Sequence, residues 1–403
     1  MKDWKIDELN LFVIILQISF LLLNFLDNAG LDIPILKEVI GFYLVLFIPG
    51  TLFLRIINLD RIDSKGQILL YTIGSSLVIL MVIGFLMNYL YPILGMNKPL
   101  SPFSIIITLN LFIFILCFLS YFIDIRRANK SPTNKVDLKN LVSSPLLFPF
   151  IIPILSILGA YMMNIYQSNI LTILMIFLIG VVAFMVSLGK LIPSKLYPLI
   201  VFIISISILL HKSLITNHIW GWDINTEYFL ANQVILNSFW NESLHLNYNS
   251  MLSVMVIAPI LSSFIDIGLV WIMKIIYPFL FSLVPLGLYY IFCKQTNPRI
   301  AFFSVFLFVI LFTFHTEMLA VVRQQVGELM LVLVLMLIVS DQLELTKRYF
   351  LAVVFGMSII VTHYGLTYVL MIILLISAFL LYVPDNLKPY YKFWPRINKS
   401  AVV

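Results

Sequence analysis

The stretch 168–189 reads SNILTILMIFLIGVVAFMVSLG and contains no charged residue. A run of about 20 apolar residues is long enough for a helix to cross the hydrocarbon core of a bilayer. Similar runs recur along the 403-residue chain, in which 62% of the residues are hydrophobic and 11% are charged. Because a soluble domain carries about 25% charged residues, most of this chain needs lipid as its solvent. The composition predicts an all-α, polytopic membrane helix bundle.

We expect about twelve transmembrane helices. Their apolar runs lie at 9–26, 38–57, 68–91, 102–123, 146–166, 168–189, 197–212, 268–292, 300–315, 322–340, 349–362 and 366–383. The first run is too long for the apolar core of a signal peptide, so we expect it to be retained as a span. The last two runs are short and could form either two helices or one long or broken helix.

Lysine and arginine residues indicate the orientation, because they concentrate in cytoplasmic loops. With a cytoplasmic N-terminus, 20 of the 25 basic residues fall on the cytoplasmic side. The other five are Lys37, Lys98, Lys212, Lys274 and Arg323. This distribution requires that the apolar stretch 250–266 does not cross the membrane. We therefore predict a multi-pass cell-membrane protein with both termini in the cytoplasm, and a stretch 250–266 that either lies in the outer interface or re-enters from it.

The basic segment 126–144 is the clearest internal boundary. It separates an N-terminal four-span region, 1–125, from a membrane region over 145–403, and we interpret it as a cytoplasmic linker. The outer loop 213–266 is the longest excursion from the apolar runs, which favours a functional role. The net charge of +6 agrees with basic cytoplasmic loops. No basic run interleaves with aromatic residues, so nucleic acid is not an expected partner.

Asp223 and Glu227 are the first candidate site residues. They stand four residues apart in the outer loop, and residues at that spacing share one face of a helix. Such a pair could supply a general base or hold a divalent cation such as Mg²⁺ or Mn²⁺. The structural alternative is an acidic helix cap at Asp223 followed by a solvated Glu227.

Two further polar clusters are expected at the same membrane face. The first contains Glu317, Arg323, Gln324 and Glu328, and it begins the span 322–340. The guanidinium of Arg323 suits a lipid phosphate, although an internal pair of Arg323 with Glu317 or Glu328 is the alternative. The second is His363 with Tyr364, between the last two apolar runs. Ionisable groups at membrane depth usually face a cavity or a partner.

In this order, the features resemble the GT-C glycosyltransferases, which use polyprenyl-phosphate sugars, and most closely an archaeal family of multi-pass membrane proteins. The resemblance covers 197–383 well and 38–123 weakly. It rests on 221–227, 229–265, 315–317, 323–325 and 363–364, with 46–50 as a further likeness in the N-terminal region. It implies that Asp223 is a general base, Glu227 its neighbour and Glu317 a second acidic contributor. The chain departs from the family by stopping at Val403, so we expect a minimal or truncated member, or one completed by another chain.

We therefore expect a glycosyltransferase that moves a hexose or pentose from a polyprenyl-phosphate donor to a lipid, glycan or protein acceptor on the outer face. Arg323 or Lys274 would hold the donor phosphate, and Gln324, His363 and Tyr364 would complete the binding site. One alternative is a non-enzymatic carrier, flippase or assembly subunit for lipid-linked glycans. A carrier usually has polar residues near the bilayer midplane, whereas here they gather at one face. A family member without activity is the third possibility.

Overall fold

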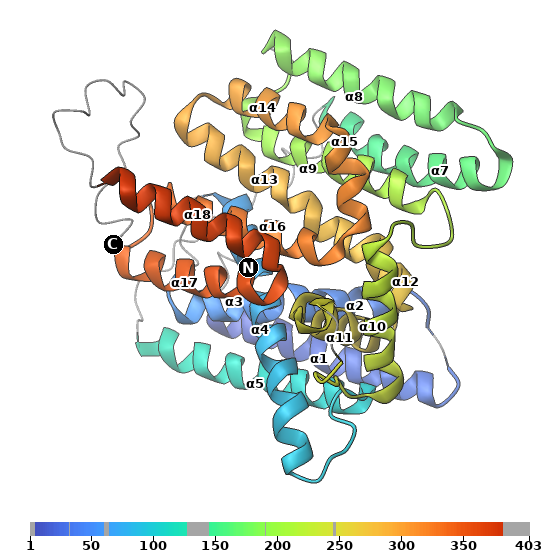
Figure 1. The fold of residues 1–403 in the computed structure, drawn as a ribbon, viewed down its shortest axis with the longest axis vertical. Coiled ribbons are helices and arrows are strands. Elements are labelled where there is room, and N and C mark those ends of the chain that lie inside the picture. Colours follow the sequence, from blue (N-terminus) through green and yellow to red (C-terminus); the bar gives the residue numbers. More distant parts are fainter. Residues whose placement is uncertain are drawn as a thin grey trace.

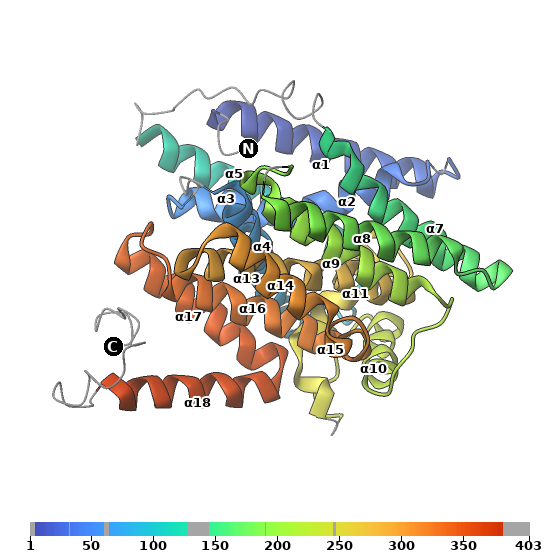
Figure 2. The ribbon, with the colours of Figure 1, turned by 90° about the horizontal axis from the view of Figure 1, so that it is seen from above.

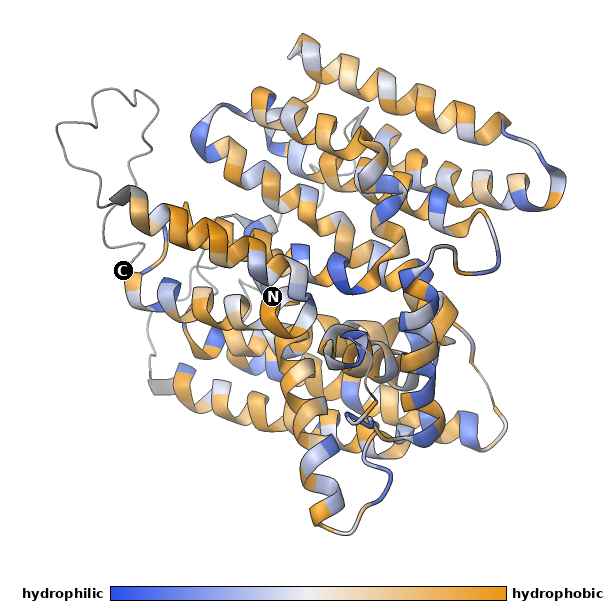
Figure 3. Ribbon diagram, in the orientation of Figure 1, coloured by the Kyte–Doolittle hydropathy of each residue, from blue (hydrophilic) through white to orange (hydrophobic). Residues whose placement is uncertain are grey.

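The computed structural model describes residues 5–31, 33–59, 64–126, 145–189, 191–244 and 247–381. Over these ranges the chain is built from helices and short connections, without a β-strand. Most of the long helices run roughly parallel or antiparallel to one another, and α4 is inclined to them (Figure 1). Apolar residues cover their lengths, and many polar residues stand at the turns (Figure 3). The predicted all-α, polytopic membrane bundle is confirmed.

The N-terminal part contains the helices α1 to α5. Their bounds are Ile6–Asn28 for α1, Leu36–Leu46 for α2, Ile48–Ile56 for α3, Lys65–Ile93 for α4 and Pro102–Arg126 for α5. Helices α2 and α3 together form one apolar span. At the start of α3, the backbone N–H of Gly50 donates to Ser76 Oγ of α4 at 2.8 Å. A Cβ at Gly50 would lie 1.9 Å from the Thr72 carbonyl oxygen, so α3 can approach α4 this closely only with glycine there.

The C-terminal part begins with the short 3₁₀ helix η1 and continues to α18. The bounds of the long helices are Ile151–Tyr166 for α7, Ile170–Leu188 for α8, Tyr197–Leu214 for α9, Asp223–Asn237 for α10, Ala258–Ile265 for α11, Tyr277–Gln295 for α13, Pro298–Ile310 for α14, Val322–Ile338 for α16, Leu345–Thr362 for α17 and Tyr364–Leu381 for α18. Short helical pieces join them: η1 (Pro145–Phe150), η2 (Ser194–Leu196), η3 (Asn247–Ser250), η4 (Ser253–Ile257), α12 (Leu269–Trp271), η5 (Ile272–Ile276), α15 (Phe312–His315) and η6 (Glu317–Ala320).

Within the described residues, all twelve predicted apolar runs are largely helical, but 322–340 and 366–383 are not among the helices long and apolar enough to cross a membrane. Nine spans in the described residues are long and apolar enough to cross a membrane, and α14 with the segment Phe312–Ala320 forms a tenth, bent by 63°. Helices α17 and α18 are separate, because His363 between them has an extended backbone with φ −157° and ψ 109°. The predicted linker 126–144 lies almost wholly outside the described residues, so the proposed domain boundary stays a prediction.

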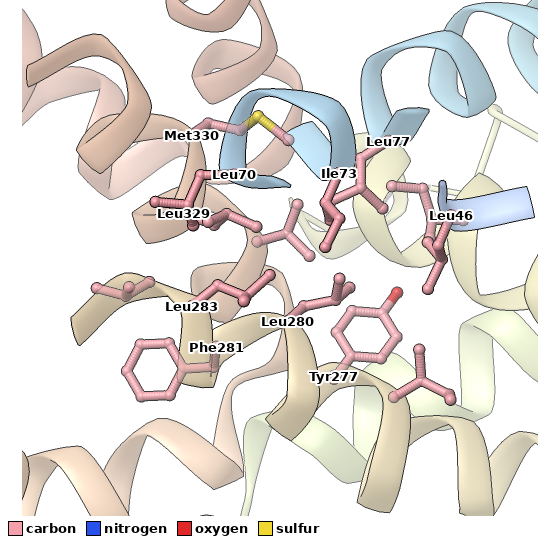
Figure 4. Packing of buried hydrophobic residues seen from close by; sticks show 14 of the residues in the cluster. Leu46, Leu70, Ile73, Leu77, Tyr277, Leu280, Phe281, Leu283, Leu329 and Met330 are labelled. Carbon is pink, nitrogen blue, oxygen red and sulfur yellow. The ribbon is translucent and has the colours of Figure 1, made fainter. Parts of the chain in front are cut away.

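The apolar core lies where α2, α4, α13 and α16 meet (Figure 4). Leu46 of α2, Leu70 and Ile73 of α4, Leu280 of α13 and Leu329 of α16 are fully buried there. Side chains from four separate helices thus fill one interior, and this packing fixes the position of α16, whose first turn carries Arg323.

The segment Ser253–Ile265, formed by η4 and α11, is shorter than a membrane-spanning helix. Its 13 residues would extend about 20 Å as a helix, against about 30 Å for the hydrocarbon core. Residues 253–261 are buried, and the segment packs against α2, α4, α5 and α10. Of the two expected arrangements, burial by protein agrees with a re-entrant segment and disagrees with a helix lying in the membrane interface.

Both ends of the loop 213–266 lie at the same end of the bundle. Ser213 Oγ, at the end of α9, donates to the Lys274 carbonyl at 2.6 Å, in the turn before α13. The last turn of α11 is tied to the connection between α1 and α2, because Lys37 Nζ bonds both Asp266 and Asp27. The chain therefore leaves and re-enters the bundle at one end, as the sequence-based topology requires. We call this end the α10 end.

Candidate functional site at the α10 end

Helix α10 lies across the ends of the long helices (Figure 1) and is seen nearly end-on in Figure 2. Its far end is fastened by the Leu100 N–H, which donates to the Ser238 carbonyl at 2.8 Å. Next to it, Asn88 of α4 bonds both the backbone N–H and the carbonyl of Trp240, each at 2.9 Å. These contacts hold the C-terminal end of α10 against α4 and the loop after it, and the first turn of α10 lies beside the start of α16.

Asp223 is the first residue of α10, and Trp222 occupies the N-cap position without a side-chain cap bond. The expected cap at Asp223 is therefore wrong by one position. The Asp223 carboxylate instead binds side chains from other elements: Arg323 Nη2 donates to Oδ2 at 2.7 Å, and Tyr248 Oη donates to Oδ1 at 3.2 Å. One third of the Asp223 side chain is exposed, so this carboxylate remains reachable.

Glu227 follows one turn later and is fully buried. The predicted solvated glutamate is thus wrong. Its Oε1 accepts from Arg323 Nη1, and its Oε2 accepts from the Val322 N–H at 2.9 Å. A carboxylate here suits the positive end of the α16 dipole and satisfies an amide that has no partner within its own helix. Burial nevertheless raises the pKa of Glu227 to about 7, against the opposing effect of Arg323.

Arg323 joins the two carboxylates across the gap between α10 and α16. Its guanidinium carbon lies 4.1 Å from the centre of the Tyr248 ring and 5.9 Å from that of Tyr364. Such contacts with aromatic faces stabilise a cation. The alternative interpretation, in which Arg323 pairs with Glu317 or Glu328, is wrong. Glu328 instead accepts from Gln324 Nε2 at 2.9 Å, as their shared helix face indicates.

His363 and Tyr364 lie at the junction of α17 and α18, beside the start of α16. Their rings stack with centres 5.5 Å apart, and His363 Nδ1 accepts from the Leu366 N–H at 3.0 Å. Burial, together with the positive charge of Arg323, lowers the pKa of His363 to about 4. The imidazole is therefore neutral near pH 7 and holds the first turn of α18, while Tyr364 faces the arginine.

Lys274 and Glu317, two of the predicted site residues, do not join the cluster around Arg323. Lys274 is buried, and its Nζ donates to the carbonyls of Thr216 at 2.5 Å and His218 at 2.8 Å. It thereby fixes the loop that leads to α10. Glu317 is exposed at the start of η6, and in the described part of the chain its carboxylate has no ion-pair partner. The structure thus brings together Asp223, Glu227, Arg323 and Tyr364, with His363 behind them.

Tyr248 is the residue that the sequence did not single out. It stands 25 residues from Asp223, and its hydroxyl and ring contact both charges of the Asp223–Arg323 pair. Burial and the neighbouring Asp223 carboxylate raise the pKa of the Tyr248 hydroxyl. No spacing rule links residues so far apart, and only the fold of the loop brings them together.

The donor set does not suit a divalent metal. A metal held by Asp223 and Glu227 would need the space between their carboxylates, and the guanidinium of Arg323 lies there. Over the described ranges, no group of three or more His, Cys, Asp or Glu side chains comes close enough to bind an ion. These two carboxylates neutralise the positive charge of Arg323 in place of that of a metal ion.

No protein-family model, curated protein or solved structure matches this chain. The resemblance to the GT-C glycosyltransferases therefore rests on the short motifs alone, and the site is interpreted below from its own geometry.

Proposed function

We propose that this chain is a membrane glycosyltransferase that moves a sugar from a polyprenyl-phosphate donor to a hydroxyl acceptor at the outer face of the membrane. The observation that carries the proposal is the position of Asp223. It is a partly exposed carboxylate on a helix across the bundle end, bound to an arginine whose fork fits phosphate oxygens. A reachable base beside a phosphate-binding cation is what sugar transfer from a phosphate carrier needs.

The proposed reaction exchanges one partner of Arg323. The donor phosphate takes the Nη2 donor from Asp223, and Arg323 keeps the bond from Nη1 to buried Glu227. Freed Asp223 then accepts the proton of the acceptor hydroxyl. The acceptor oxygen bonds to the anomeric carbon with inversion, and the bond from that carbon to the phosphate oxygen breaks. Both electrons of this bond leave with the phosphate, whose charge Arg323 stabilises.

The other predicted residues take supporting roles in this scheme. Both oxygens of the buried Glu227 accept hydrogen bonds from the start of α16, so Glu227 positions Arg323. Tyr248 and Tyr364 flank the guanidinium and limit its movement. Lys274 holds the loop before α10 and leaves phosphate binding to Arg323. Trp222 is almost fully exposed next to Asp223, which suits contact with the membrane interface or with a sugar ring.

The test is sugar transfer by the full chain in proteoliposomes supplied with polyprenyl-phosphate hexoses, measured as release of free polyprenyl phosphate. Asp223→Asn keeps an oxygen for Arg323 but removes the base, so turnover should fall about 10²-fold or more. Glu242→Gln is the matched control, since Glu242 is an exposed carboxylate of the same loop. Absence of turnover by the wild-type chain, or equal turnover by Asp223→Asn and the control, would contradict the proposal.

One observation favours the alternative, a carrier for lipid-linked glycans. The cluster lies beside the bent pair α14 and Phe312–Ala320 and the break between α17 and α18, and broken helices next to charges are typical of transporters. A carrier would move a fluorescent polyprenyl-phosphate sugar across the bilayer without releasing polyprenyl phosphate. The same proteoliposomes, assayed for both events, distinguish the two functions.

A further inference from the structure

A polar cavity opens at the end of the bundle opposite the Asp223–Arg323 cluster. It has a volume of about 660 Å³ and lies between the connection from α8 to α9 and the turn from α13 to α14. The lining residues that matter below are Gly189, Ile192, Asn297, Arg299 and Ile300. Helix α9 separates it from the α10 end by 18 residues, about 27 Å of helix. We call it the α8–α14 pocket, and it is independent of the function proposed above.

The backbone on both sides of the pocket is fixed by helix caps. Asn297 Oδ1 accepts from the N–H groups of Arg299 at 3.1 Å and Ile300 at 3.0 Å, which holds the first turn of α14. Opposite, Gly189 ends α8 with φ +70°, in the left-handed region. A Cβ at Gly189 would lie 1.6 Å from Arg299 Nη2. The guanidinium therefore occupies the space that any other residue at 189 would fill.

Among the described residues of the lining, Arg299 is the one cationic side chain. In the described part of the chain, no carboxylate pairs with its guanidinium. Other basic residues near the ends of α13, α16 and α17 are engaged. Lys294 bonds Asp341 at 2.6 Å, Lys347 pairs with Glu344 at 2.9 Å, and Arg348 donates to the Ser340 carbonyl at 2.6 Å. Over the described ranges, the pocket thus presents an arginine that no carboxylate pairs with.

The rim of the pocket is apolar on the side of the long helices. Leu188 at the end of α8, Leu191 after it and Ile300 in α14 are each about half exposed. Ile300 lines the pocket, and Leu188 and Leu191 are next in the chain to its lining residues Gly189 and Ile192. A ligand that contacts both the arginine and these residues needs an anionic group joined to hydrocarbon chains.

We propose that the α8–α14 pocket binds the phosphate headgroup of an anionic membrane lipid. Arginine binds phosphate oxygens with two parallel N–H donors, and basic pockets between transmembrane helices on the cytoplasmic side are suited to such headgroups. The acyl chains would lie along Leu188, Leu191 and Ile300. In the predicted topology, the pocket faces the cytoplasmic leaflet. A lipid bound here would link the hairpin of α7 and α8 to the start of α14.

The experiment is native mass spectrometry of the detergent-purified full chain titrated with phosphatidylglycerol, with phosphatidylcholine as the zwitterionic reference. Arg299→Gln should weaken the first phosphatidylglycerol site at least fivefold and leave phosphatidylcholine binding unchanged. Arg299→Lys should give an intermediate loss, because lysine keeps the charge without the fork. The matched control is Lys294→Gln, which removes one charge near the same surface from a residue paired with Asp341. It should change binding less than twofold.

Three results would overturn the proposal. Equal weakening by Arg299→Gln and Lys294→Gln would indicate general attraction to a basic surface. Unchanged phosphatidylglycerol binding by Arg299→Gln would remove the arginine from the site. Displacement of the lipid by 10 mM inorganic phosphate would assign the pocket to a free anion, because a lipid also held by apolar contacts resists such competition. Gly189→Ala is a second variant, and it should weaken binding because the added Cβ displaces the guanidinium.

Discussion

Glu227 offers the sharpest test of how the charged cluster is held together. Two effects of opposite sign act on this fully buried carboxylate. Removal from water disfavours its charge, and Arg323 and the Val322 N–H favour it. With the pKa of Glu227 raised from 4.5 to about 7, desolvation is the larger effect. Glu227→Gln removes the charge at constant size, so the variant reports which effect dominates.

The sign follows from proton binding. A carboxyl group whose folded pKa exceeds its unfolded pKa stabilises the folded state at low pH, and this contribution is lost as pH rises through the folded pKa. One pKa unit corresponds to 1.36 kcal/mol. The raised pKa of Glu227 therefore destabilises the folded state by about 3 kcal/mol at pH 8 and by less than about 1 kcal/mol at pH 5. The amide nitrogen of Gln cannot accept a hydrogen bond, which costs about 1–3 kcal/mol at every pH. The pH-dependent part is therefore separable from the constant part.

We expect the free energy of unfolding of the wild-type chain to fall relative to Glu227→Gln by about 2–3 kcal/mol between pH 5 and pH 8. The assay is reversible SDS unfolding in bicelles, followed by tryptophan fluorescence at both pH values. Glu242→Gln, at an exposed position, is the control and should show no such change. A difference that is constant with pH, or that moves in favour of the wild type as pH rises, would refute the reasoning and make Arg323 the stronger influence.

Two further predictions concern the elements around the cluster. The pKa of His363 is lowered from 6.5 to about 4. The wild type should therefore lose up to about 3 kcal/mol of stability relative to His363→Gln as pH falls from 6.5 to 4, measured by the same unfolding assay. Parallel stability curves for the two proteins would contradict this assignment. Lys274→Met leaves the carbonyls of Thr216 and His218 without their donor. The free energy of unfolding should fall by about 1–3 kcal/mol and proteolysis within 215–221 should become faster, whereas Lys98→Met, at an exposed position, should do neither. Unchanged cleavage at 215–221 would show that Lys274 does not hold this loop.

The transmembrane helices could be predicted because their signal is local. Each apolar run, such as 168–189, contains enough hydrocarbon to require a helix, whatever the rest of the chain does. The distribution of basic residues also identified 250–266 as a stretch that does not cross. The internal structure of that stretch could not be predicted, because its burial depends on α2, α4 and α5, which lie far away in sequence.

The partners in the candidate site could not be predicted, because they come from separate elements. Arg323 is 100 residues from Asp223 and 96 from Glu227, whereas the expected partner Glu328 is nearby on the same helix. Helical spacing identified the face shared by Gln324 and Glu328, and there it was correct. It carries no information about α10, whose position depends on contacts such as those between Asn88 and Trp240. Sequence patterns therefore found the charged residues, but the alternative pairs that they offered for Arg323, with Glu317 or Glu328, do not form.

The cluster joins three places where a helix begins: Asp223 starts α10, Arg323 lies in the first turn of α16, and Tyr364 starts α18. Helix starts are positively polarised, so three of them around one arginine would repel without negative charge nearby. Asp223 and Glu227 provide that charge, and the two differ in exposure in a way that separates their roles. Loss of the buried Glu227 carboxylate should weaken the contact between α10 and α16. Loss of the Asp223 charge should mainly remove the carboxylate that a substrate can reach. A variant such as Asp223→Asn that abolishes sugar transfer at wild-type stability would therefore identify chemistry, and a parallel loss of stability would identify assembly.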